Sequence, residues 1–98
     1  MTQDQLIAIV DLCKHYEVET SIFDEIENFQ ILEIVTISNK KYLNREHLND
    51  VEKIIRLNRD LDINMEGIDV IFNLLKKVER LQNDMSELKN RLQIYEDL

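Results

Sequence analysis

The last third of the chain carries a regular apolar stripe, which constrains the fold more than any other feature of the sequence. Its apolar residues are separated alternately by three and four positions, the a/d pattern of a heptad repeat. Eight residues form this seam: Ile71, Leu74, Val78, Leu81, Met85, Leu88, Leu92 and Tyr95. The pattern predicts one long α-helix with a coiled-coil seam along one side.

A helix from residue 65 to residue 97 would be about 50 Å long. A compact domain of this chain length has a radius of gyration of only about 13 Å, so the helix must project beyond the rest of the protein. The outer seam residues would then lie in water unless a second copy of the chain covers them. We therefore expect a homodimer in which the two helices pair through the seam.

Charges beside the seam leave the orientation of the two helices open. In a parallel pair, Asp84 would face Lys89 of the partner subunit and Arg91 would face Glu96 of the partner subunit, and both contacts are attractive. Exposed ion pairs of this kind contribute only about 0.2–1 kcal/mol each. They are too weak to choose between parallel and antiparallel pairing.

Two short helices are predicted near the N-terminus. Thr2 and Gln5 have the spacing of a capping box, and a first helix that ends near Tyr16 follows. Its apolar face is formed by Leu6, Ile9, Val10 and Cys13. A second helix is predicted over residues 20–28. Two short helices joined by a tight turn are typical of a helix-turn-helix.

The residues from Leu32 to Leu43 are mostly β-branched or aromatic and predict a β-hairpin with Ser38 and Asn39 at its turn. A two-stranded hairpin is only marginally stable alone, so it must pack on the helices, in the position of a wing. Asn44 then caps a helix that continues to about Asp60.

The predicted fold class is mostly α, with a small winged helix-turn-helix module in residues 1–62 and a long C-terminal dimerisation helix in residues 63–98. A hinge joins the two parts. Asn64 stands at the N-cap of the long helix, where its side-chain oxygen can accept from a free backbone amide. Gly67, the only glycine, follows it. Because glycine costs roughly 1 kcal/mol relative to alanine within a helix, we expect Gly67 to let another backbone approach closely.

The hinge also resembles the signature of a known bacterial family. Residues 59–68 read RDLDINMEGI, and residues 72–75 read FNLL. This stretch resembles the chaperone-modulator family typified by CbpM, whose pattern is R-D-L-G-[VI]-N-[LM]-x-G-[IV] and then a leucine pair. The sequence departs from the pattern at Asp62, where the family usually has glycine. A helix end there requires a positive φ, which aspartate adopts less readily than glycine.

The resemblance extends more loosely over the whole chain, whose front half is similar to a MerR-type winged helix-turn-helix. It implies that the partner is a J-domain co-chaperone of the CbpA/DnaJ type, held so that it cannot stimulate its DnaK-type chaperone. It also implies a basic helix on the J-domain as the face that is bound. MerR-type proteins generally dimerise through antiparallel helices, so the resemblance favours that orientation.

Negative charge is concentrated in the first third of the chain. Residues 1–35 hold eight acids and one base, whereas residues 36–98 hold twelve acids and eleven bases. An acidic surface attracts basic partners and repels nucleic acid, although solvation alone also explains such a surface. We expect the partner-binding residues to be the acids in and beside the second helix: Glu19, Asp24, Glu25 and Glu27.

The alternative function is that of a MerR-like DNA-binding transcriptional regulator. Helices that read DNA carry Arg, Lys, Asn or Gln toward base edges and phosphates. The second helix instead has three acids and no basic residue. Lys40, Lys41 and Arg45, on or beside the wing, are the bases that such a regulator would use on phosphates. The charge balance favours a protein partner over nucleic acid.

No enzymatic chemistry, cofactor, metal or small-molecule substrate is expected. One glycine is too few for a phosphate-binding loop, and Cys13 and His15 are two residues apart on a helix, where they point in different directions. No apolar run approaches the ~20 residues of a transmembrane helix. A single cysteine fits a reducing compartment, so we expect a cytoplasmic protein.

Overall fold

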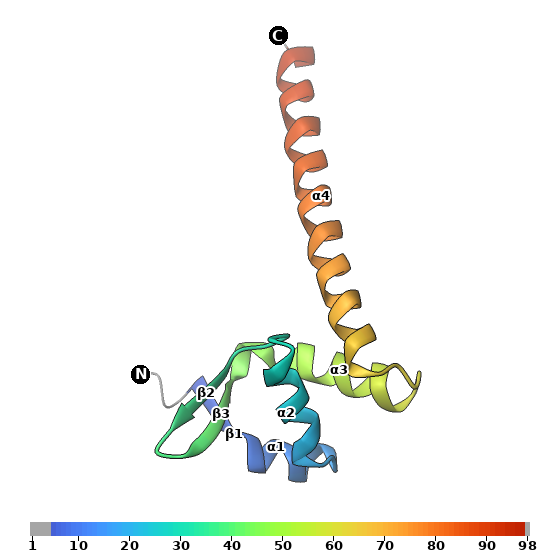
Figure 1. Ribbon diagram of the computed structural model, residues 1–98. Coiled ribbons are helices and arrows are strands. Elements are labelled where there is room, and N and C mark those ends of the chain that lie inside the picture. Colours follow the sequence, from blue (N-terminus) through green and yellow to red (C-terminus); the bar gives the residue numbers. More distant parts are fainter. Residues whose placement is uncertain (1–4, 98) are drawn as a thin grey trace.

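The computed structural model describes residues 5–97, in which a small group of helices and strands carries one long projecting helix (Figure 1). The elements in chain order are β1 (Leu6–Ala8), α1 (Ile9–Tyr16), α2 (Thr20–Asn28), β2 (Ile34–Ile37), β3 (Lys40–Asn44), the 3-10 helix η2 (Arg45–His47), α3 (Leu48–Arg59) and α4 (Met65–Asp97). The predicted mostly α fold class with a long C-terminal helix is confirmed, whereas dimerisation through that helix stays a prediction. The capping box predicted at Thr2 lies outside the described residues.

The predicted hairpin is confirmed as β2 and β3, which form the wing. These strands pair antiparallel with Ile37 opposite Lys40. The two residues between them, Ser38 and Asn39, have φ angles of 52° and 66°. A two-residue turn with positive φ at both positions is favoured in hairpins because its twist matches that of the strands.

A third strand, β1, pairs with the other edge of β3, so the sheet has the order β1-β3-β2. Leu6 lies opposite Asn44, and Ala8 lies opposite Tyr42. The sequence assigned Leu6 to the first helix, and this assignment is wrong. Pairing satisfies backbone groups of β3 that would otherwise lack partners beside the core, and it supports a hairpin that is marginal alone.

The two helices of the helix-turn-helix both end without glycine. α2 has the predicted bounds, and α1 is followed by Glu17 in the left-handed region, with a φ of 54°. The backbone N–H of Val18 then donates to the carbonyl of Cys13 at 3.0 Å, as in a Schellman motif. Gln30, just after α2, also has a positive φ of 55°.

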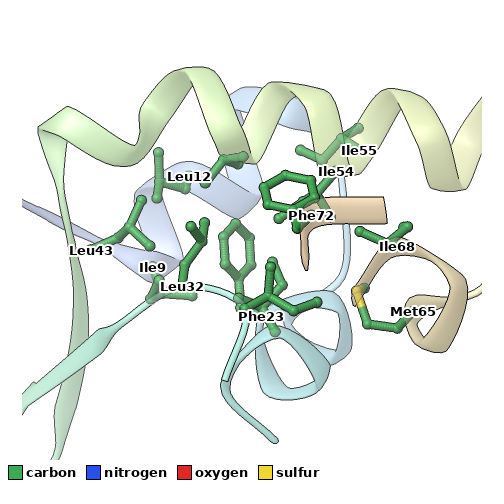
Figure 2. Close-up of a cluster of buried hydrophobic side chains, with 13 residues drawn as sticks. Ile9, Leu12, Phe23, Leu32, Leu43, Ile54, Ile55, Met65, Ile68 and Phe72 are labelled. Carbon is green, nitrogen blue, oxygen red and sulfur yellow. The ribbon is translucent and has the colours of Figure 1, made fainter. Parts of the chain in front are cut away.

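Apolar side chains from every α-helix and from β3 meet in one core (Figure 2). Phe23 of α2, Leu43 of β3 and Ile54 of α3 are its almost fully buried centre, and no polar or charged side chain of residues 5–96 is buried. Three residues of α4 belong to the same core: Met65, Ile68 and Phe72. The first turns of α4 are therefore anchored in the globular part.

The rest of α4 projects away from the core, as the sequence predicts (Figure 1). The longest dimension of the protein is 59 Å, and its radius of gyration is 17.9 Å, well above the ~13 Å of a compact domain of this length.

The segment predicted as one helix after Asn44 instead forms the short 3-10 helix η2, followed by α3. The Asn44 Oδ1 accepts from the backbone N–H of Glu46 at 3.0 Å and caps that turn.

The connection between α3 and α4 is held by its own side chains. Asp62 has the predicted positive φ, 58°, and the Asn58 Nδ2 donates to the carbonyl of Ile63 at 3.0 Å. The Asn64 Oδ1 accepts from the backbone N–H of Gly67 at 2.9 Å, which confirms the predicted cap. A Cβ on Gly67 would lie 2.8 Å from the Ile63 Cγ2. Gly67 thus makes room for a side chain, and the predicted close approach of another backbone is wrong.

Arg59 joins this connection to the helix-turn-helix. Its Nη2 donates to the carbonyl oxygen of Glu17 at 2.8 Å and to that of Tyr16 at 3.2 Å. Carbonyl groups at a helix C-terminus have no partner within the helix. Arg59, the first residue of the RDLDINMEGI signature, therefore supplies hydrogen bonds from α3 to the carbonyl groups at the C-terminal end of α1.

Candidate protein-binding surface

The four acids expected to bind a partner lie on or beside α2. Phe23 is buried on the inner face of this helix, while Asp24 and Glu25 are exposed on its outer side. Glu27 is half-buried. Glu19, directly before α2, is exposed, and its side chain makes no capping hydrogen bond. The core contacts of α2 thus turn its acidic side toward solvent.

Lys41 of β3 brings two of these acids together. Its Nζ donates to the Glu27 Oε1 at 2.7 Å and lies 3.7 Å from the Asp24 Oδ1. The hydrogen bond with Glu27 raises the pKa of Lys41, and the charges of both carboxylates act in the same direction. We call this contact the Lys41 bridge. Glu19 and Glu25 form no ion pair with any residue of the described chain.

An open groove lies beside the Lys41 bridge, where the wing meets β1 and the first turns of α1 and α2. Val10, Asp11, Asp24, Lys41 and Tyr42 are among its lining residues. Val10 is 59% exposed, although the sequence placed it on the apolar face of the first helix. Because residues 6–8 form a strand, the helical face begins at Ile9, and Val10 points outward. The groove therefore combines an apolar side chain with the carboxylates of Asp11 and Asp24 and with the ammonium groups of Lys40 and Lys41.

The wing offers few charges for a nucleic acid. Lys41, one of the three bases considered for phosphate contacts, forms ion pairs with Asp24 and Glu27 of α2. Lys40 and Arg45 are exposed. No base accompanies them on α2, whose residues read TSIFDEIEN. Helices that read DNA in the major groove depend on basic and amide side chains at this place.

A second exposed surface runs along α4. Ile71 is half-buried against the core, and every residue from 73 to 96 is exposed. The remaining seam residues are between 47% and 75% exposed: Leu74, Val78, Leu81, Met85, Leu88, Leu92 and Tyr95. Val70, Leu75 and Ile94 add exposed apolar side chains outside the seam. Such a long apolar surface is unusual for a monomer.

The surroundings of Cys13 and Tyr16 raise the pKa of both side chains. Cys13 is half-buried, and burial, followed by the charge of Asp24, raises the pKa of its thiol, which keeps the thiol protonated and weakly nucleophilic. Burial also raises the pKa of Tyr16, whose hydroxyl donates to the Glu52 Oε2 at 3.3 Å. Within residues 5–97, no three His, Cys, Asp or Glu side chains gather as a metal site would require.

Charged residues interrupt the apolar pattern of every helix, α4 included. Across residues 5–97, none is long and apolar enough to cross a membrane.

The fold and its surfaces define a winged helix-turn-helix protein with a projecting C-terminal helix. Residues 7–90 match the family described as MerR HTH family regulatory protein, and the chain belongs to this family. The MerR-like architecture predicted from the sequence is thereby confirmed. No curated protein and no solved structure matched the chain.

Proposed function

We propose that this protein is a cytoplasmic, non-enzymatic chaperone modulator that binds the J-domain of a CbpA/DnaJ-type co-chaperone and keeps it from its DnaK-type chaperone. One observation carries the proposal: the solvent side of α2 presents Asp24, Glu25 and Glu27 and no basic residue. The resemblance of residues 59–68 to the CbpM signature supports the same function.

A J-domain that carries a basic helix would meet complementary charge on α2. Such complementarity increases the rate of association and selects the partner, whereas apolar contacts supply most of the affinity. Val10, which is exposed in the groove beside the Lys41 bridge, would supply an apolar contact of this kind. The proposed interface is therefore the outer side of α2 together with this groove.

The second candidate function is DNA binding as a MerR-like transcriptional regulator. Membership of the MerR family and the exposure of Lys40 and Arg45 favour it. The acids of α2 oppose it, because they would lie against phosphates.

The test replaces Asp24 and Glu25 together by lysine and measures binding to a J-domain and to random duplex DNA at two salt concentrations. Both residues are exposed, so the fold should be retained. We expect slower association with the J-domain and a weaker salt dependence, because attractive charge has been reversed. Glu79→Lys combined with Glu87→Lys is the matched control, since it changes the net charge equally on α4, outside the seam.

If both double variants bind the J-domain equally, α2 is not the interface. Under the DNA-binding alternative, the α2 variant should bind duplex DNA more tightly, because repulsion has been removed. Tight, sequence-dependent duplex binding by the unmodified protein would rule out the modulator function.

We also propose that two copies of the protein pair through α4. The seam exposes Leu81, Met85, Leu88 and Leu92, each 58–68% exposed, and fully burying such a side chain contributes roughly 1.5–3 kcal/mol. A second copy carries a seam of the same spacing and length, so each side chain finds an apolar partner.

A further inference from the structure

The Lys41 bridge uses the carboxylates that a basic partner would need. Asp24 and Glu27 are three residues apart, so their side chains lie on one side of α2. The Lys41 Nζ reaches both, at 3.7 Å and 2.7 Å. These contacts are accessible from solvent, since the Lys41 side chain is 42% exposed and those of Asp24 and Glu27 are 60% and 37% exposed.

We propose that Lys41 is an internal counter-ion of the partner-binding surface, and that a basic partner helix must displace it to bind. The identity of the partner as a J-domain rests on the proposed function, whereas the displacement follows from the bridge itself. The ammonium of Lys41 occupies the place that a lysine or arginine of the partner would take on Asp24 and Glu27.

This arrangement selects the kind of partner. A single partner lysine would only exchange one ammonium for another. An arginine does better, because its planar guanidinium can donate to two carboxylate oxygens at once. Two cations one helical turn apart would satisfy Asp24 and Glu27 separately. An apolar side chain beside them would cover Val10 in the adjoining groove. The fitting partner is an amphipathic helix with an arginine or a pair of cations next to an apolar residue.

The proposal predicts that removal of the bridge tightens binding. Lys41→Met keeps an unbranched side chain but leaves both carboxylates available. Exposed ion pairs are weak, so the expected gain in affinity is roughly two- to fivefold. The gain should shrink in high salt, because exposed charges are then screened.

Lys40→Met is the matched control. Lys40 is the neighbouring residue of β3, is exposed, lines the same groove as Lys41, and forms no ion pair with another residue of the described chain. Both substitutions remove one positive charge from the wing, so a general charge effect would change binding equally. Lys41→Arg is a second control that retains a cation in the bridge.

Four proteins are compared by isothermal titration calorimetry: the unmodified protein and the variants Lys41→Met, Lys40→Met and Lys41→Arg. Each is titrated with two probes, a J-domain and a synthetic helical peptide that has two arginines one turn apart beside a leucine. Tighter binding of the peptide by Lys41→Met than by Lys40→Met, with no gain for Lys41→Arg, supports the counter-ion. Equal effects of the two methionine variants, or no peptide binding by any protein, overturn it. Peptide binding that follows this pattern without binding of the J-domain supports the counter-ion and overturns the proposed function.

Discussion

At the scale of single residues, the left-handed backbone conformation is adopted by residues other than glycine. Five residues of the described chain have positive φ: Glu17, Gln30, Ser38, Asn39 and Asp62. Gly67 instead lies in the first turn of α4, where its lack of a side chain leaves space for Ile63. The size of glycine, rather than its conformational freedom, therefore matters at this position.

The role of Gly67 predicts that the effect of one substitution depends on the side chain at position 63. Gly67→Ala should destabilise the protein despite a gain of about 1 kcal/mol in helix propensity. The new Cβ would lie 2.8 Å from the Ile63 Cγ2 and 3.2 Å from the Asn64 Oδ1, the capping atom. In an Ile63→Ala background the first of these contacts is gone, so Gly67→Ala should cost less stability than it does in the unmodified protein. Denaturant unfolding of the four proteins measures this coupling; an equal change in the free energy of unfolding in both backgrounds would contradict the steric explanation.

At the scale of elements, local patterns predicted some parts of the fold and missed others. α2, the hairpin and α4 were predictable because their spacing or turn residues lie within the element itself. β1 was missed because a three-residue strand is defined by its pairing with β3, far along the chain. The Lys41 bridge was missed for the same reason: its acids were found, but the packing of the wing beside α2 decides that Lys41 meets them.

Arg59 is the clearest contact between elements that a substitution can test. Arg59→Met keeps the aliphatic stem but removes the two hydrogen bonds to the carbonyls of Tyr16 and Glu17. We expect a loss of about 1 kcal/mol in the free energy of unfolding, at the low end for charged donors because Arg59 is exposed. Arg56→Met, on the same helix and also exposed, is the control. Equal changes in thermal unfolding for both variants would show that the carbonyl contacts contribute nothing.

At the scale of the whole molecule, the projecting part of α4 has no contact with the core to account for its apolar seam. The prediction of a homodimer follows from this exposure. Leu81→Glu combined with Leu88→Glu should yield monomers, because both side chains are more than half exposed in one copy and would be buried by a second.

Sedimentation velocity distinguishes monomer from dimer in this experiment. Asn83→Glu combined with Asn90→Glu is the control, since it adds the same charge to α4 at positions outside the seam. The control protein should sediment as a dimer. A dimer formed by the Leu81 and Leu88 variant would show that the seam assignment is wrong.

The unbroken course of α4 has a consequence for multivalent binding. No residue interrupts the helix from Met65 to Asp97. Two copies joined through this helix would therefore hold their α2 surfaces at a fixed distance from each other. Antiparallel helices would place the surfaces at opposite ends, and parallel helices would place them side by side. Avidity arises only where both sites can be occupied at once. If the proposed function and the proposed pairing both hold, a partner with two J-domains would be recognised by the distance between them as well as by their charge.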